Sequence, residues 1–573
     1  MLPFNKIIPL LGIFLLQKAG MAYKTEVRHT ELVQELTMRG LAIPTGAGVS
    51  VTQVEFPFSG ASSTDYLPNL ASSQFTGKTI IDQSGSGTTS SHGTTVGNNL
   101  YGNTISMAPN IVAVDVYDTG DWQDNQGWET GDPFIETNPL QNHSWVGFTL
   151  NDDAAVRMDF AVERDGFLPI AGIYNSDFGN QATPSDIPEI YGSIYNGISV
   201  GVSDGTHRAG VTPATYGPGR TKPEIVAPNS FTSFATPYVT AAAAMLIESA
   251  GIDPDAKKQL VLKAILLAAA NKSPYIDWDQ TPLRPLDDIY GAGELDVYES
   301  YFIQQAGKQS PATTVKERGW NIDNLGSGNS HNYNIWVPNG FKLRNLSALI
   351  TWNLPVSVAL ERVRGNLVNV YNAGSLANMS LSLSQQPSGV SQTSDSLVDN
   401  IEHIWLDTSA ELSSGNYTLT VTTNSSTTYA IAWRSELYQD YSLWKTTAFT
   451  TTPIADQDSE DDPEKDGIPN LLEQAFGGNP EIEDLSILPT SETVTEGNSQ
   501  YLQISFRKPT HENGLSYTVE TVTELDDIWS SQEADVTLQA IETLPDNFDL
   551  YTYRRVAPLD NHEKAFLRVS IAD

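Results

Sequence analysis

The chain has 573 residues, enough for about three or four domains with sizeable cores. Its 69 aspartates and glutamates outnumber 32 lysines and arginines, and the net charge of -37 argues against nucleic acid or an anionic membrane surface as a partner. The chain contains no cysteine, which excludes disulfides, thiolate zinc sites and cysteine nucleophiles.

Residues 1–22 have the pattern of a secretory signal peptide. Lys6 precedes the apolar stretch Ile7–Leu16, and the small residues Gly20 and Ala22 suit a cleavage site. The apolar stretch is too short to span a bilayer as a mature helix, and no later stretch is long and apolar enough. We therefore expect a secreted protein, extracellular or periplasmic, without a membrane span. The alternative interpretation is a buried N-terminal helix.

Between residues 23 and 303, short β-rich apolar runs alternate with helical patterns. This alternation predicts an α/β domain with a mostly parallel sheet. We expect strands at Val49–Val54, Ile111–Val116, Phe167–Ile173, Gly197–Val202 and Ile225–Ala227, and helices at Ala154–Arg164, Tyr238–Ile247 and Pro254–Ala270.

The rest of the chain is β-rich in pattern. Residues 308–450 contain alternating runs such as Leu346–Trp352 and Tyr417–Thr422, separated by turns rich in Ser, Thr, Asn and Gly, which is typical of a β-sandwich. An acidic linker follows at 455–482. The last block, 483–573, is expected to be a small β domain.

Ser233 lies at the entrance of an expected buried helix. A turn at Pro228 and Asn229 follows the strand Ile225–Ala227, and the apolar helical run begins at Tyr238. On local sequence alone, Thr232 or Ser233 is most simply a helix N-cap. The other interpretation is a nucleophile held in the positive field of the helix N-terminus.

A serine nucleophile needs an imidazole to accept its proton, and that imidazole needs an acid to orient it. His92 lies among small residues in the segment Ser90–Gly97, which allow a ligand to approach its ring closely. Glu55 ends an apolar strand and is the expected acid. Asp82 is the weaker candidate, because it is expected in a Gly- and Ser-rich loop with no strand leading into it.

The segments Gly46–Glu55, His92–Thr94 and Ala227–Pro237, in this order, resemble the subtilisin-like serine proteases, or subtilases. The resemblance covers about Leu32 to Val297. It implies a three-layer α/β catalytic domain with a mostly parallel sheet, here followed by all-β sandwich domains. It also implies a serine endopeptidase that cleaves protein or peptide substrates through an acyl-enzyme. The family's roles fall on Ser233 as nucleophile, His92 as base and Glu55 as orienting acid.

Two further segments extend the resemblance. Phe167–Asn175 matches the family strand whose closing asparagine donates to the oxyanion, which assigns that role to Asn175. Asn142–Gly147 matches the edge segment that pairs with the substrate backbone, so substrate contacts are expected at Ser144, Trp145 and Gly147.

Three positions depart from the family pattern. Glu55 replaces an aspartate, and Phe231 and Tyr174 replace glycines beside the nucleophile and the oxyanion residue. The two aromatic residues add bulk near the expected substrate position. They support an alternative function, in which the protein is a catalytically inactive surface binding or adhesion protein with the same fold.

The acidic linker has the spacing of a calcium loop. Oxygen ligands are expected from Asp462, Glu464, Asp466, the Ile468 carbonyl and Glu473, with Gly467 at the sharp turn. The stretch through Pro480 resembles the thrombospondin type 3 acidic repeats of secreted bacterial proteins. It predicts structural Ca²⁺, whereas no catalytic cofactor is expected. The alternative is a disordered acidic linker.

Overall fold

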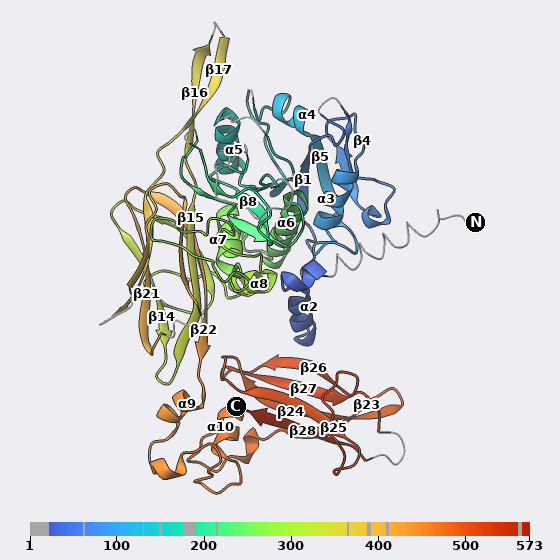
Figure 1. Cartoon of the computed structure of the whole chain (residues 1–573), viewed down its shortest axis with the longest axis vertical. Helices are drawn as coiled ribbons and strands as arrows, with labels where there is room; N and C mark the ends of the chain where they lie inside the picture. Colours follow the sequence, from blue (N-terminus) through green and yellow to red (C-terminus); the bar gives the residue numbers. More distant parts are fainter. Residues whose placement is uncertain are drawn as a thin grey trace, which may run out of the picture.

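The computed structural model describes residues 22–60, 63–129, 131–147, 152–175, 191–213, 216–363, 366–386, 391–407, 412–559 and 564–573. The predicted signal peptide lies outside these residues apart from its last position. Figure 1 shows an α/β domain beside an elongated β domain, with a second β domain at the C-terminal end.

A seven-stranded parallel sheet forms the centre of the α/β domain. Its strands are short apolar runs, and in β7 and β8 every residue is buried, as expected for a sheet covered on both faces. The order across the sheet is β11 (Ile225–Ala227), β8 (Ile198–Val202), β7 (Leu168–Gly172), β6 (Leu140–His143), β1 (Ser50–Glu55), β5 (Ala113–Asp118) and β3 (Thr79–Asp82).

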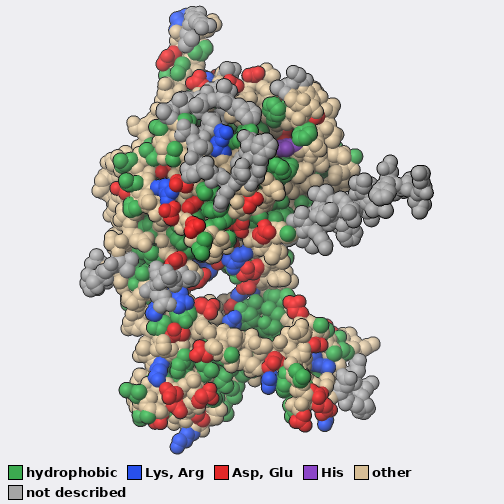
Figure 2. Space-filling model, in the orientation of Figure 1, with side chains coloured by type: hydrophobic (Ala, Val, Ile, Leu, Met, Phe, Trp, Pro, Cys, Tyr) green, Lys and Arg blue, Asp and Glu red, His purple; other side chains and the backbone are tan. Residues whose placement is uncertain are grey.

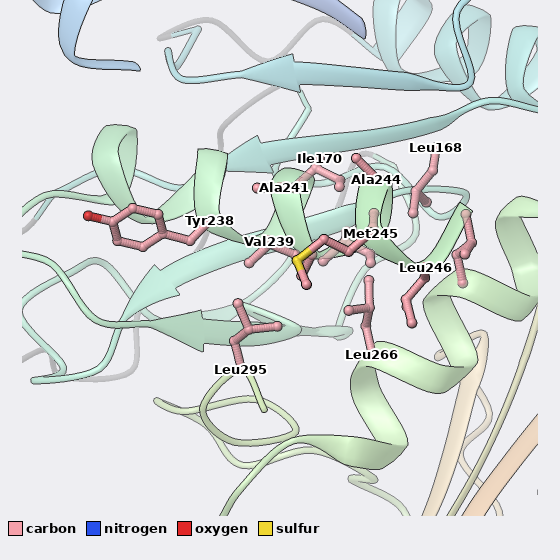
Figure 3. Packing of buried hydrophobic residues seen from close by; sticks show 14 of the residues in the cluster. Leu168, Ile170, Tyr238, Val239, Ala241, Ala244, Met245, Leu246, Leu266 and Leu295 are labelled. Atoms are coloured by element: carbon pink, nitrogen blue, oxygen red, sulfur yellow. The ribbon is translucent and has the colours of Figure 1, made fainter. Parts of the chain in front are cut away.

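Helices cover both faces of this sheet. Leu168 and Ile170 of β7 point toward α6 (Thr232–Ser249), where Figure 3 shows them packed near Ala241 and Ala244. Ala171, the residue after Ile170 on the strand, belongs to a separate apolar cluster with α5 (Asp152–Asp165) on the opposite face. The predicted fold class, a three-layer α/β domain with a mostly parallel sheet followed by all-β domains, is confirmed.

Strand β1 is the topological switch point of the sheet. Its parallel neighbours are β5 on one side and β6 on the other, with Glu55 opposite Asp118 and Val54 opposite His143. In open parallel sheets, crevices form at the carboxyl ends of the strands where the order reverses. The fold therefore places a candidate site at the end of β1, next to Glu55.

The smaller elements surround this sheet. No helix in the described ranges is long and apolar enough to cross a membrane. The remaining helices of the domain are α2 (His29–Met38), α3 (Ser91–Tyr101), α4 (Thr119–Asp124), α7 (Gln259–Ala269) and α8 (Val297–Gln305), and its short strands are β2 (Asp65–Leu67), β4 (Thr88–Thr89), β9 (Gly210–Val211) and β10 (Thr221–Lys222).

Two mainly antiparallel sheets form the sandwich that follows. Alternate residues such as Tyr417, Leu419 and Val421 fill the space between them. One sheet contains β12 (Thr314–Val315), β14 (Ser330–Val337), β21 (Gly415–Thr423), β18 (Met379–Gln386) and β19 (Ser391–Ser394), and the other contains β13 (Gly319–Leu325), β22 (Thr427–Tyr438), β15 (Lys342–Trp352) and β20 (Ile401–Leu406). Strands β12 and β14 form a parallel pair.

The sandwich is joined to the α/β domain through helix α7. Every residue of α7 is buried, and the apolar cluster of the α/β domain continues into Leu349 and Ala432 of the sandwich. The Ser347 hydroxyl donates to the Ala268 carbonyl at 2.7 Å. The two units therefore share one core.

The C-terminal portion begins with two short helices, α9 (Tyr441–Ala448) and α10 (Asn470–Phe476). Arg39, which follows α2, binds Asp549 of this portion at 2.7 Å. Its strands are β23 (Thr490–Glu496), β24 (Ser499–Pro509), β25 (Ser516–Val522), β26 (Val536–Thr543), β27 (Phe548–Arg555) and β28 (Phe566–Ala572).

Candidate active site

Four predicted site residues lie where elements of the sheet layer begin or end. Glu55 is the last residue of β1, and Asn175 follows β7 by three positions. His92 is the second residue of α3, and Ser233 is the second residue of α6, the helix that follows β11. Because all these strands are parallel, their carboxyl ends lie on the same side of the sheet, and these residues are found there.

His92 and Glu55 are in direct contact. The Nδ1 atom of His92 lies 2.7 Å from Oε2 of Glu55, whose side chain is fully buried. The extra methylene of glutamate therefore does not prevent the contact predicted for the acid. With Nδ1 engaged by the carboxylate, Nε2 is the ring nitrogen that can accept a proton.

A second layer of hydrogen bonds fixes the Glu55 carboxylate. Gln53 donates from Nε2 to Oε1 of Glu55 at 2.9 Å, and Gln53 accepts from the Tyr101 hydroxyl at 2.6 Å. Sequence analysis missed both residues. The sequence pattern that indicates the role of Gln53 is its position two residues before Glu55 on the same strand, because this spacing places both side chains on one face of the sheet.

The pKa of His92 reflects two opposing causes. Burial lowers the pKa, but the charge of Glu55 and its hydrogen bond to the ring raise the pKa by more, so the net shift is upward. Glu55 therefore stabilises the imidazolium form that a general base reaches after it takes a proton.

Asp82 has a different role in the structure. It is the last residue of strand β3, so the expectation that no strand leads into it is wrong. Its carboxylate accepts from the Tyr66 hydroxyl at 2.5 Å and from the N–H groups of Gly85 and Gly87, both at 2.9 Å. These contacts hold the loop after β3, whereas the carboxylate in contact with His92 is that of Glu55.

The start of α6 is anchored to the end of β7. Phe231 occupies the N-cap position, so neither Thr232 nor Ser233 is the cap. The Thr232 hydroxyl donates to the Ile173 carbonyl at 2.6 Å, and the Thr232 N–H donates to Oδ1 of Asn175 at 2.8 Å. Ser233 is half-buried directly after this anchored residue.

His92 approaches the same helix start. Its ring lies 5.4 Å from the ring of Phe234, the residue after Ser233, measured between centroids. Asn99 of α3 donates to the Phe234 carbonyl at 3.1 Å. Helix α3, which carries His92, and helix α6, which carries Ser233, are therefore in contact at Phe234.

Asn175 is oriented by its contact with α6. Because Oδ1 accepts from Thr232, the Nδ2 end of the planar amide points away from that N–H group. Gly172 permits this close approach, since a Cβ atom there would lie 2.9 Å from the Thr236 hydroxyl oxygen.

The predicted substrate segment continues from the end of β6. Ser144 accepts from Asn142 at 2.9 Å, and Asn142 accepts from Thr240 of α6 at 3.1 Å. Trp145 is buried and donates to Nδ1 of His143 at 3.3 Å. Ser144, Trp145 and Gly147 follow the carboxyl end of β6, the strand that lies between β1, which ends at Glu55, and β7, which leads to Asn175.

The bulky departures from the family pattern lie toward the surface. Phe231 is 51% exposed, and its ring packs edge-on against Phe234 at 5.9 Å. Tyr174 carries the Arg208 guanidinium 4.9 Å above its ring. A further aromatic residue, Phe58, is 64% exposed and stacks 6.5 Å from the His92 ring. Sequence analysis did not single out Phe58.

The predicted calcium loop brings its acids together. Carboxylate oxygens of Asp462, Glu464 and Asp466 all lie within 4.8 Å of one another. Asp462 accepts from the N–H groups of Lys465 at 2.8 Å and Gly467 at 2.9 Å, which closes the loop. The backbone N–H of Ile468 donates to Asp466 at 2.8 Å.

Glu473, on helix α10, is not among the three carboxylates that lie within 4.8 Å of one another, but it interacts with their charges. Its side chain is fully buried, and among the described residues neither its carboxylate oxygens nor those of Glu464 have a hydrogen-bond partner. Burial, followed by the charges of Glu464, Asp466, Asp484 and Asp462, raises the pKa of Glu473 to about 8. Unpartnered buried carboxylates close to one another are the donor set that a hard cation neutralises.

Comparisons with known proteins give only distant similarities. No family model matches the chain, and no curated protein matches its sequence. Among solved structures, the chain is similar to the prenylagaramide maturation protease PagA, at 19% identity and a TM-score of 0.31 over 44% of this chain and 93% of that one. For the patellamide maturation protease PatA, the identity is 18% and the TM-score is 0.32, and the match covers 46% of this chain and 98% of that one. For tripeptidyl peptidase 2, the identity is 11% and the TM-score is 0.25, and the match covers 84% of this chain and 56% of that one.

Proposed function

We propose that this protein is a secreted serine endopeptidase that hydrolyses peptide bonds through an acyl-enzyme. The proposal rests on the contact of 2.7 Å between Nδ1 of His92 and the carboxylate of the buried Glu55. The His92 ring also packs beside Phe234, at the start of the helix that carries Ser233. An oriented base next to a serine at a helix N-terminus is the arrangement that activates a hydroxyl for acyl transfer.

In the proposed reaction, the Ser233 hydroxyl attacks the substrate carbonyl while Nε2 of His92 takes its proton. Glu55 stabilises the imidazolium, and Nδ2 of Asn175 together with the Ser233 N–H binds the oxyanion. The proton then passes from His92 to the leaving amine. Water, activated by the same imidazole, releases the acyl group and restores the Ser233 hydroxyl.

The substrate backbone is proposed to lie along Ser144, Trp145 and Gly147. These residues lie at the carboxyl edge of the sheet, between the strand that carries Glu55 and the strand that leads to Asn175. An extended peptide placed there would pair with the main chain of this segment and bring its carbonyl toward Ser233.

A fluorophosphonate probe tests the proposal, because it labels serines whose hydroxyl is activated. We expect the wild type to be labelled, and labelling to be lost in Ser233→Ala and His92→Ala. Ser230→Ala is the matched control, since Ser230 is exposed three residues before Ser233 and should leave labelling intact. A folded wild type that is not labelled would contradict the proposal and favour the inactive binding protein.

We also propose that Asp462, Glu464, Asp466 and Glu473, with the Ile468 carbonyl, hold a structural Ca²⁺. The support is the clustering of three carboxylates and the lack of hydrogen-bond donors, among the described residues, to the half-buried Glu464 and the buried Glu473. The ion would neutralise this charge and tie the loop to helix α10.

A further inference from the structure

A two-stranded ribbon, formed by β16 (Val356–Val363) and β17 (Asn366–Ala373), projects from the sandwich alongside the α/β domain (Figure 1). Its base is fastened to that domain. Asp132 accepts from Nδ2 of Asn369 at 3.0 Å and from the Tyr371 hydroxyl at 2.7 Å. The Phe160 ring of α5 packs edge-on against Tyr371 at 5.0 Å. These contacts fix the direction in which the ribbon points.

The ribbon face that carries Tyr371 also carries two exposed leucines, together with Asn369 and Arg362. The register pairs Leu360 with Asn369 and Arg362 with Leu367, so both leucines share the face of Tyr371. Leu360 is 65% exposed and Leu367 is 59% exposed. Figure 2 shows apolar side chains along the projecting arm. Exposed apolar side chains grouped on one face mark an interaction surface.

This face borders a hollow of about 600 Å³ against the α/β domain. Among the described residues, the opposite wall carries the acidic residues Glu129, Asp132 and Asp153 and the cation Arg157. The volume is in the range that binds small ligands or short peptide segments. One wall is therefore apolar, and the other has an excess of negative charge.

The hollow lies close to the proposed active site along the chain. Asp153, in the first turn of α5, comes six residues after Gly147 of the proposed substrate segment. Six residues span at most about 20 Å. In Figure 1, the ribbon and α4, the helix at the carboxyl end of β5, lie at the same end of the molecule. A polypeptide bound at the sheet edge can therefore reach the hollow.

We propose that the ribbon and this hollow bind an extended segment of the polypeptide substrate, at a distance from the scissile bond. The segment carries apolar side chains, which contact Leu360 and Leu367, alternating with basic side chains, which face the acidic wall. In the described part of the ribbon each strand pairs only with the other, so each has an open edge that can add a peptide strand. This inference rests on the proposed peptidase function.

The test uses a fluorescein-labelled decapeptide of alternating leucine and lysine and the Ser233→Ala protein, so that binding is measured by anisotropy without cleavage. We expect Leu360→Ser/Leu367→Ser to raise the dissociation constant on the order of tenfold, because two leucine contacts are lost. Ile252→Ser is the matched control, since Ile252 is fully exposed elsewhere and should leave the dissociation constant unchanged. A peptide with glutamate in place of lysine should bind more weakly.

Three results would overturn the inference. The first is no binding of the peptide, the second is equal binding by the double variant and the wild-type ribbon, and the third is a dimer in sedimentation that the double variant dissociates. The third would identify the ribbon face as an interface between two copies. Fluorophosphonate labelling of the double variant separates this inference from the peptidase proposal, because the double variant should label like the wild type whether or not the peptide binds.

Discussion

At the scale of single residues, Glu55 decides how His92 works. Its carboxylate contacts Nδ1 of His92 and is itself held by Gln53. Replacing Glu55 with glutamine keeps the size of the side chain but removes the charge. We expect Glu55→Gln to lower kcat/KM for a peptide substrate by about 10³- to 10⁴-fold, because the imidazolium loses its counter-charge. Asp82→Asn should change activity far less, and a larger loss in Asp82→Asn would show that the acid is misassigned.

The same residue sets the pH dependence. The base must be neutral to accept a proton, so activity rises with pH through the pKa of His92. Burial lowers that pKa, and Glu55 raises it by a larger amount. Removing the charge in Glu55→Gln should therefore move the acidic limb of the kcat/KM profile to lower pH. The measurement is a pH profile of both proteins, and an acidic limb that moves upward in the variant would contradict the assignment.

Phe231 tests whether bulk beside the nucleophile obstructs the site. The side chain is 51% exposed and rests on Phe234. Because it points outward, we expect Phe231→Gly to change the rate of fluorophosphonate labelling by no more than about threefold, as for an ordinary surface substitution. An increase of a hundredfold or more would show that Phe231 closes the site in the wild type.

At the scale of elements, the sequence predicts the sheet well and its side-chain networks poorly. The strand expected at Ile225–Ala227 has these bounds in the structure, and β1 and β5 are displaced by one and two residues from the predicted positions. Apolar runs report burial, which explains this success. The ends depend on hydrogen bonds to neighbouring strands, which one sequence does not display. For the same reason, the Gln53 and Tyr101 contacts behind Glu55 could not be predicted from residue types alone.

The start of the helix expected at Pro254–Ala270 was predicted five residues too early. The structure starts α7 at Gln259, because the residues from Pro254 to Lys258 form turns, in which Asp253 accepts from the N–H of Asp255. The N-terminal end of a helical pattern is set by such local side-chain bonds. The rest of the predicted helix is present as α7, Gln259–Ala269, and all of its residues are buried.

The proposed calcium loop is expected to stabilise the C-terminal portion of the chain. Chelation should lower the melting temperature of the C-terminal portion by several degrees, because an ion that binds only the folded state stabilises that state. Glu473→Gln should abolish most of this effect, since Glu473 is the buried carboxylate of the group. Glu460→Gln, at an exposed position in the same segment, is the control. A transition that does not respond to chelator in the wild type would remove the proposal.

At the scale of the whole molecule, the α/β domain and the sandwich are expected to unfold together. Helix α7 is completely buried, and Leu349 of the sandwich belongs to the apolar cluster of the α/β domain. Asn400 of the sandwich also donates to the Tyr195 carbonyl at 2.8 Å. Separating the two units would expose this shared core to water. Calorimetry should therefore show one transition for both units.

Leu349→Ala tests this shared core. The substitution should destabilise the joint unit by about 2–5 kcal/mol, the cost of an emptied leucine site in a packed core. Fluorophosphonate labelling should be lost at the same temperature as the sandwich unfolds. Two separate transitions, with labelling that survives unfolding of the sandwich, would show that the units are independent.

In the proposed mechanism, Ser233 carries the acyl group during catalysis. Mass spectrometry of the protein quenched in acid during turnover of an activated ester substrate measures this directly. We expect a mass increase equal to the acyl group, located on the peptide that contains Ser233, and no such increase in Ser233→Ala. Hydrolysis of the substrate with the acyl group on another residue, or with the Ser233→Ala protein still active, would contradict it.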